Sequence, residues 1–200
     1  MASTNDLIIR FALKNFLGSQ HANDAKVRII EELGIQHGIA RIDIAVVNGI
    51  MHGYEIKSDQ DTLDRLPEQM TVFNSVFDKM TLVVGKSHLY DAINIVPDWW
   101  GIVIAKIDEN GSIVFNLIRE CQKNIGQDKV SIARLLWREE ALKILEKAGE
   151  ANGLRSKSRD SIYQKLSIVF DKKTLEKKVR DTLFFRSEWR PDAPLMLNGD

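Results

Sequence analysis

The segment that most constrains the fold is residues 40–57, where two stretches with strand character flank a turn signal. In ARIDIAVV (40–47), apolar and polar residues alternate and β-branched residues are frequent, which predicts a strand. Asn48-Gly49 is a typical tight-turn pair, and YEIK (54–57) begins a second strand after a break at Gly53. We therefore predict that the two strands pair antiparallel, with residues 50–52 lengthening the connection.

The elements around this pair alternate between helix and strand. Apolar residues at three- and four-residue steps predict helices over 5–16, with Asn5 or Asp6 as N-cap, and over 61–77, with Pro67 in the first turn of the main helix. Apolar runs predict strands at 81–85, 99–107 and 112–118, and a short helix is expected at 87–93. Residues 29–35 suit either a short helix or the first strand of a hairpin turning at His37-Gly38. The order predicts an α/β fold.

From Ser131 onward the pattern is helical. One amphipathic helix is predicted from Ile132 to Leu145, with Gly153 as a stop, and further helices are predicted at 158–169 and 173–186. Residues 155–159 are the predicted linker between them. We therefore divide the chain into an α/β domain, residues 1–125, and a helical, basic C-terminal extension, residues 126–200.

Charge is distributed unevenly along a chain whose net charge is zero. Residues 1–130 hold 13 basic and 17 acidic side chains, whereas residues 131–190 hold 15 basic and 9 acidic ones. This asymmetry is expected of a protein that holds a cation in one part and contacts phosphate with another. A solvated helical face explains the charge equally well.

Several classes of protein are excluded by composition. No apolar run reaches the roughly 18 residues that span a bilayer, and the first residues lack the layout of a signal peptide. Cys121 is the only cysteine, so there is neither an intrachain disulfide nor a cysteine-rich metal site. We expect a cytoplasmic protein without a membrane partner.

Candidate chemistry lies in RIDIAVVNGIMHGYEIKSD (41–59). Glu55 and Lys57 are two residues apart on a strand and share a face, and Asp43 lies on the preceding strand of the hairpin. Two carboxylates and an ammonium make a poor core unless a cation compensates them. Asp43, Glu55 and the backbone carbonyl of Ile56 could hold Mg²⁺ or Mn²⁺, and Lys57 could then orient the attacking water. A surface ion pair of Lys57 with Glu55 or Asp59 is the alternative.

Asp43 followed twelve residues later by Glu55 and then Lys57 resembles the PD-(D/E)XK superfamily of restriction enzymes, Holliday-junction resolvases and repair nucleases. Further similarity lies in GYEIKSDQDTLDRLPEQ, VPDWWGI and LLWREEAL, which look like a branch of small bacterial and phage members. The resemblance covers residues 25–107. It implies a restriction-endonuclease-like core, with a central mixed sheet flanked by helices, that hydrolyses DNA and leaves 5′-phosphate and 3′-hydroxyl ends.

The resemblance also implies roles for individual residues. Gln69 and Phe73 look like the superfamily's Gln-x-x-x-Tyr element, and Glu32 looks like its additional upstream metal ligand, with Glu31 as the fallback. Ile42 replaces the proline that names the motif, which is harmless because only the aspartate is a ligand. Phe73 lacks the tyrosine hydroxyl, so the role of that group does not transfer.

Two other functions stay open beside a DNA-cleaving enzyme. The same fold could serve a catalytically idle DNA-binding protein, although the complete Asp, Glu and Lys set argues against it. It could also serve a phage-defence or repair component that becomes active only with a protein partner. A homodimer is a further possibility.

The basic extension supplies the predicted DNA contact. Lys173, Lys177 and Arg180 form one stripe of the last predicted helix, and Leu175, Val179 and Leu183 form another. Such a helix can pack on one side and lie against phosphate on the other. A solvated helix without a nucleic-acid partner is the alternative.

Overall fold

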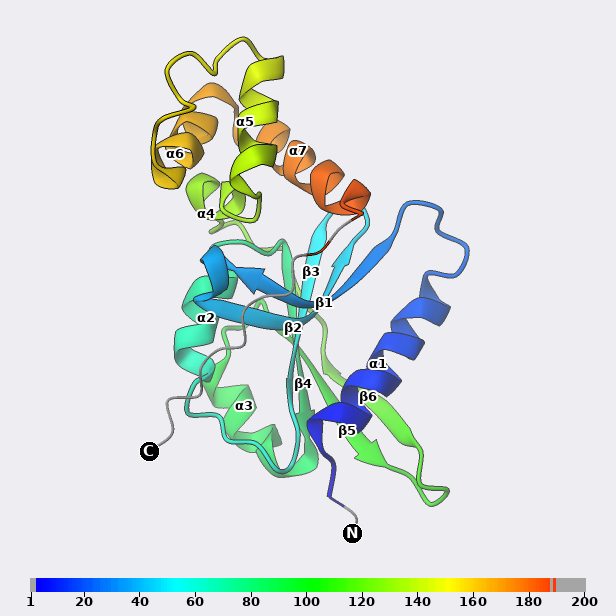
Figure 1. Ribbon diagram of the computed structural model, residues 1–200. Coiled ribbons are helices and arrows are strands. Elements are labelled where there is room, and N and C mark those ends of the chain that lie inside the picture. The colour runs from blue at the N-terminus through cyan, green and yellow to red at the C-terminus, as the bar shows by residue number, and fades with distance from the viewer. Residues whose placement is uncertain (1–2, 188, 190–200) are drawn as a thin grey trace.

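The computed structural model describes residues 3–187 and 189. Six strands form one sheet in the spatial order β1-β2-β3-β4-β5-β6 (Figure 1). The strands are β1 (Arg28–Ile35), β2 (Ala40–Val47), β3 (Met51–Lys57), β4 (Lys79–Gly85), β5 (Gly101–Ile107) and β6 (Ile113–Arg119). The helices associated with the sheet are α1 (Asp6–Gln20), α2 (Leu66–Asn74) and α3 (Leu89–Ile95), and the short 3₁₀ turns η1 (Gln36–Gly38) and η2 (Lys86–His88) follow β1 and β4.

The sheet is mixed. β1, β2 and β3 pair antiparallel in chain order, β4 and β5 continue parallel to β3, and β6 returns antiparallel to β5. The predicted antiparallel pairing of the strands around Asn48-Gly49 is therefore confirmed, and so is the α/β class. Residues 29–35, which suited a helix or a strand, lie in β1.

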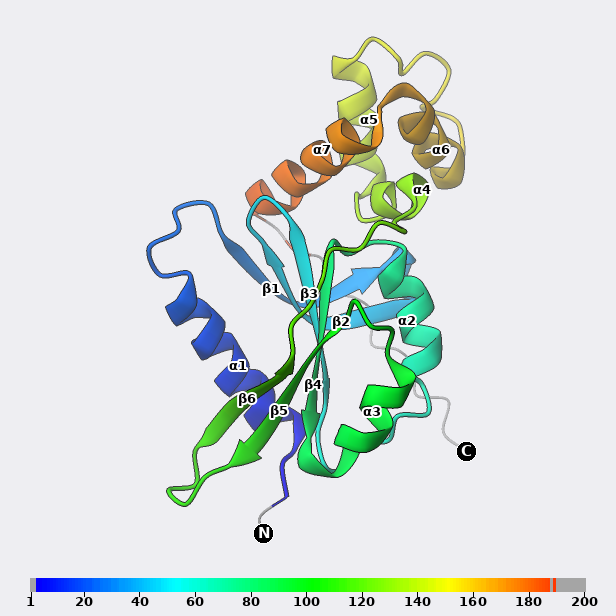
Figure 2. The same ribbon diagram turned by 180° about the vertical axis from the view of Figure 1, so that it is seen from behind.

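Helices cover both faces of this sheet (Figures 1 and 2). On one face, Ile9, Leu13 and Leu17 of α1 pack on a small apolar cluster from the central strands. On the other face, a larger cluster joins α2 and α3 to the sheet and runs on into the C-terminal helices. Those helices are α4 (Lys129–Ala133), α5 (Arg138–Lys147), α6 (Arg159–Val169) and α7 (Lys172–Phe185). None of the helices in the described part of the chain combines the length and apolar character that a membrane crossing requires.

The start of β3 differs from the prediction. The strand begins at Met51, and Asn48 closes the preceding turn by donating its amide to the carbonyl of Ile50. Gly53 does not break the strand. A Cβ at Gly53 would lie 2.5 Å from the sulfur of Met80, so glycine at this position of β3 leaves room for the Met80 side chain of β4.

The helix predicted from Ile132 to Leu145 is in fact two helices, α4 and α5, separated at Trp137. Trp137 has an extended backbone, and its amide donates to the Glu140 side chain at the start of α5. The carbonyl groups released by the break find partners far along the chain. The Tyr163 hydroxyl donates to the carbonyl of Leu136, and Arg186 donates to that of Leu135. The end of the predicted extension, residues 190–200, lies outside the described residues.

A carboxylate fixes the beginning of α1 against the sheet. Asp59 accepts hydrogen bonds from the amide and hydroxyl of Thr4 and from the amide and hydroxyl of Ser87. Partial burial raises the pKa of Asp59, but these hydrogen bonds outweigh it and lower the pKa to about 2. A Cβ at Gly85 would meet Asp59 at 2.4 Å, so only glycine fits there. Asp59 is thus engaged with α1 and η2 and does not pair with Lys57.

Candidate functional site

The candidate site lies where strand pairing is interrupted. The pairing between β2 and β3 ends at Ile44 and Tyr54, so the next positions in register are Asp43 and Glu55. In the pairing of β1 with β2, Glu32 has a positive φ of 54° and lies between the pairs Glu31–Ile44 and Leu33–Ile42, at the level of Asp43. The strands therefore bring three acidic residues into one row across the sheet.

The interruption also changes which way the side chains of β2 face. Ile42 belongs to the larger apolar cluster and Ile44 to the smaller one, although residues two apart in a regular strand share a face. The chain thus twists at Asp43. Local distortions of this kind redirect a side chain, which here places the carboxylate against the backbone of β3.

Asp43 is held from two sides. Its Oδ2 accepts the Ile56 amide at 2.7 Å, and its Oδ1 accepts from Arg10 Nη2 at 2.7 Å. Burial raises the pKa of Asp43 to about 7, and the neighbouring Glu55 carboxylate adds to that rise. The Ile56 amide and Arg10 oppose the rise without cancelling it. Asp43 is therefore a carboxyl whose ionisation is costly until a cation arrives.

Glu55 is almost completely enclosed, with 2 % of its surface exposed. Its Oε1 accepts from Lys57 Nζ at 2.9 Å and from Gln69 Nε2 at 2.7 Å, and Gln69 comes from α2. Its Oε2 is buried and has no hydrogen-bond partner among the described residues. Burial raises the pKa of Glu55, while Lys57 and Gln69 pull it down. One carboxylate oxygen is thus left for a ligand that the protein itself does not supply.

Arg10, on α1, is a member of the site that the sequence reasoning did not identify. Besides Asp43, its guanidinium pairs with Glu32, and Nη2 lies 2.9 Å from Asp6 on the preceding turn of α1. One signal of this role was visible before the structure: Asp6 and Arg10 are charged residues spaced four apart on a helix with an apolar face. Arg10 therefore places one positive charge among Asp6, Glu32 and Asp43.

The side chains of the candidate site supply only some of the ligands that a divalent cation needs. In the described part of the chain, no group of three or more His, Cys, Asp or Glu side chains gathers closely enough to hold a metal ion. Asp43 and Glu55 are two hard oxygen donors on adjoining strands, and Ile56 lies between Glu55 and Lys57. A site built from two carboxylates, a carbonyl oxygen and waters suits Mg²⁺, which retains several waters in proteins. The partnerless Glu55 Oε2 is the observation that favours this fit.

The structure does not bring all the sequence-predicted residues together. Glu32 reaches Asp43 only through Arg10, and its other oxygen pairs with Arg41. Glu31 pairs with Lys14 on α1. Phe73 is fully buried and packs beside Phe77 and Trp100 in the core.

The predicted DNA-contacting stripe lies on α7. Leu175, Val179 and Leu183 are buried, so the predicted packing face is confirmed. On the opposite side, Lys177 pairs with Asp181 at 2.7 Å and Arg180 with Glu176 at 3.8 Å, while Lys173 is exposed. Two of the three cations therefore have an acidic partner on their own helix.

Comparison with known proteins gives the family. The family described as Bacteriophage P4 protein cII matches residues 2–192, nearly the whole chain. The chain belongs to this family. Protein cII of Enterobacteria phage P4 is 29 % identical over 142 residues, which are 70 % of this chain and 53 % of the phage protein. This member of the cII family thus spans about half the length of the curated relative that it matches.

A solved structure gives a weaker likeness. The SPO1766 protein of unknown function from Silicibacter pomeroyi aligns with 73 % of this cII-family chain and 91 % of its own, with a TM-score of 0.42 and 15 % identity. A likeness at this level does not define the fold.

Proposed function

We propose that this cII-family protein is a metal-dependent nuclease that hydrolyses phosphodiester bonds of DNA, with Asp43, Glu55 and Lys57 as its catalytic core. The mixed sheet flanked by helices is compatible with the restriction-endonuclease-like core that the motif resemblance implies. The observation that carries the proposal is the buried Glu55, whose Oε2 has no hydrogen-bond partner in the described part of the chain, while Asp43 lies on the adjoining strand.

The electrostatics of the pair support a cation rather than a purely structural role. Leaving a buried carboxylate oxygen without a hydrogen bond costs about 1–3 kcal/mol, and charged groups cost more. Lys57 is the only cation that contacts Glu55 directly within the described residues, and it occupies one of the two oxygens. A bound Mg²⁺ or Mn²⁺ would supply the missing charge, polarise the phosphate and lower the pKa of a water.

The residues around the pair have separate tasks in this proposal. Asp43 and Glu55 hold the cation, with the carbonyl of Ile56 as a third ligand. Gln69 keeps the Glu55 carboxylate oriented through its 2.7 Å hydrogen bond. Lys57 orients the water that attacks phosphorus and neutralises charge on the phosphate as the bond to the 3′ oxygen breaks. The products are a 5′-phosphate and a 3′-hydroxyl.

The direct test is cleavage of a panel of labelled substrates. Purified protein is incubated with single-stranded, duplex, flap and junction DNA and with matching RNA, with Mg²⁺, with Mn²⁺ and with a chelator. We expect metal-dependent cleavage of at least one DNA, and none by an Asp43→Asn, Glu55→Gln double variant. Intact substrates under every condition, with protein that is folded and binds Mn²⁺, would contradict the proposal for the isolated chain.

A partner-activated nuclease is the second candidate, and Arg10 favours it. The Arg10 guanidinium forms ion pairs with Asp43 and Glu32. It therefore places a positive charge beside a proposed metal ligand and would compete with the cation for Asp43. A partner or substrate that moved α1 would release the site. Arg10→Met should then raise Mn²⁺ affinity and, if the wild-type chain is inactive alone, produce metal-dependent cleavage. Lower Mn²⁺ affinity in a folded Arg10→Met protein would instead assign Arg10 to positioning Asp43.

A further inference from the structure

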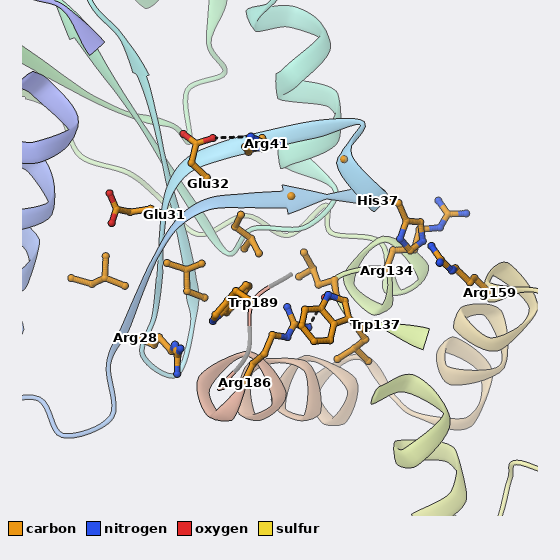
Figure 3. A pocket seen from close by; sticks show the side chains of 17 residues that line it. Arg28, Glu31, Glu32, His37, Arg41, Arg134, Trp137, Arg159, Arg186 and Trp189 are labelled. Atoms are coloured by element: carbon orange, nitrogen blue, oxygen red, sulfur yellow. Dashed lines mark hydrogen bonds and ion pairs between the residues drawn. The ribbon is translucent and has the colours of Figure 1, made fainter. Parts of the chain in front are cut away.

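Next to the carboxylates lies a groove of about 580 Å³ (Figure 3). One wall is the hairpin of β1 and β2, and the other comes from the segment after α4, from α6 and from the residues that follow α7. Five arginines line it from separate parts of the chain: Arg28, Arg41, Arg134, Arg159 and Arg186. The acidic residues in the lining are Glu31 and Glu32.

The arginines are not all neutralised by acidic partners. Arg134 and Arg186 are paired, with Asp160 and Glu140 respectively. Arg28 donates to the carbonyl of Phe184, which removes no charge, and neither it nor Arg159 has an acidic partner within ion-pair distance among the described residues. Two guanidinium charges in a concave surface repel each other and attract anions.

The end of the groove at the hairpin carries an independent sign of this positive field. His37 lies there in η1, beside Arg134 and Arg159 (Figure 3). Burial lowers the pKa of His37, and the two arginines lower it further, while Asp160 opposes them only weakly. Arg134 and Arg159 both line the groove at this end, and Arg134 is also paired with Asp160.

Away from His37, aromatic rings pack against the guanidinium groups of Arg28 and Arg186. Arg186 lies 4.3 Å from the Trp137 ring centroid and 4.7 Å from that of Trp189, and Arg28, on the hairpin wall, lies 5.8 Å from the Trp189 ring centroid. Arg186 is buried and donates hydrogen bonds to Glu140, so it stabilises the wall of the groove. Arg28 is the member of this stack that retains donors for a ligand, since the one hydrogen bond that it makes within the described residues uses Nη1. Arg28 and the pair near His37 therefore stand apart along the groove (Figure 3).

The groove leads to the carboxylates. Glu32 is part of its lining and is also joined through Arg10 to Asp43. From these contacts we infer that the groove binds a single strand of nucleic acid through successive phosphates, held at one end by Arg159 and at the other by Arg28. This inference rests on the proposed nuclease function and names its substrate as single-stranded. Arginine matches phosphate in a bidentate way, and donors spaced along a narrow basic groove suit one backbone rather than a compact anion.

The experiment measures binding without cleavage. Fluorescence anisotropy of a short labelled oligothymidine is recorded with the full chain in a chelator, over a range of salt concentrations. The groove variant is Arg28→Gln, Arg159→Gln, and its matched control is Lys143→Gln, Lys147→Gln, which removes two exposed charges from α5 outside the groove. We expect the groove variant to bind at least about tenfold more weakly, with the slope of log K against log salt reduced by about 0.7 per lost phosphate contact. The control should bind as the wild type does.

A second variant and three competitors separate the remaining outcomes. Arg28→Lys, Arg159→Lys keeps the charge and should retain most of the binding, provided that its thermal unfolding matches the wild type. Equal binding by the groove variant and the wild type overturns the inference, and so does a preference for duplex over single strand. Displacement by inorganic phosphate, or by an acidic peptide, at the same concentration of charge as the oligonucleotide also overturns it. Failure here alongside metal-dependent cleavage refutes the groove alone, whereas oligonucleotide binding without cleavage refutes the nuclease.

Discussion

The carboxylate site and the arginine groove handle charge in opposite ways. Asp43 and Glu55 are enclosed by the sheet, and burial raises the pKa of both, so their negative charge is suppressed until a cation joins them. The arginines line an open groove, and two of them, Arg28 and Arg159, have no acidic partner within ion-pair distance among the described residues. In our proposals the first region holds one small cation and the second binds an extended anion. The comparison predicts that substitutions in the two regions have separable effects.

The largest effect is expected from removing both carboxylate charges. Asp43→Asn, Glu55→Gln should abolish measurable Mn²⁺ binding and lower cleavage on the order of 10³-fold or more, because the ion loses its charged ligands. Isothermal titration and a cleavage assay measure this, and oligonucleotide binding in chelator should change little. Unaltered Mn²⁺ affinity would remove the metal assignment.

Lys57→Ala should separate metal binding from chemistry. We expect cleavage to fall by about 10²–10³-fold, because Lys57 acts on the water and the transition state, while Mn²⁺ affinity stays within a few-fold. Single-turnover cleavage at saturating metal is the measurement. A variant that cuts at the wild-type rate would show that the Lys57–Glu55 ion pair is only structural.

The raised pKa of Asp43, about 7 against 3.8 for the free group, predicts opposite pH trends for stability and for metal affinity. A raised carboxyl pKa contributes stability that is complete below the unfolded value and is lost as pH rises through the folded value. The metal-free protein should therefore lose stability between about pH 4 and pH 7. Mn²⁺ affinity should rise by up to about tenfold per pH unit over pH 6–7, because binding displaces the proton.

Denaturant unfolding in chelator and titration of Mn²⁺ at several pH values give the two curves. Asp43→Asn should flatten the stability curve, and Asp59→Asn should leave its slope above pH 4 intact, since the pKa of Asp59 is lowered to about 2. A wild-type stability that instead climbs through pH 7 would contradict the raised pKa.

The smallest effect is expected on α7. Lys173→Glu, Lys177→Glu should weaken DNA binding only a few-fold and lower the duplex salt slope by no more than about 0.9 per lysine, because Lys177 already has an acidic neighbour. Metal affinity should not change. A larger loss than in the groove variant would make α7, not the groove, the principal nucleic-acid surface.

Much of the architecture was predictable because it depends on local patterns. The alternation in residues 40–47 and the Asn48-Gly49 turn gave the β2–β3 pair, and Glu55 and Lys57 were expected on one face from strand periodicity alone. The apolar stripe of Leu175, Val179 and Leu183 likewise gave the packing of α7. Gln69 was placed beside the carboxylates by motif resemblance, and the structure has it bonded to Glu55.

The break between α4 and α5 could not be predicted, because the hydrogen-bond donors that satisfy its free carbonyl groups come from residues far along the chain. The apolar spacing across residues 132–145 is consistent with one helix. The chain bends because Tyr163 and Arg186 supply donors to the carbonyls of Leu136 and Leu135, and those residues are 27 and 51 positions apart from their acceptors. Local propensity contains no information about such partners.

What the sequence determined by itself is most of the elements and the spacing of Asp43, Glu55 and Lys57, since both follow from short-range periodicity. The tertiary structure alone decided the environment of those residues. It placed Arg10 from α1 against Asp43, left Glu55 Oε2 without a partner among the residues that the structure describes, and collected arginines from five segments into one groove. Each of these depends on which segments meet in space and on how much water they exclude, and burial of that kind is a property of the whole fold.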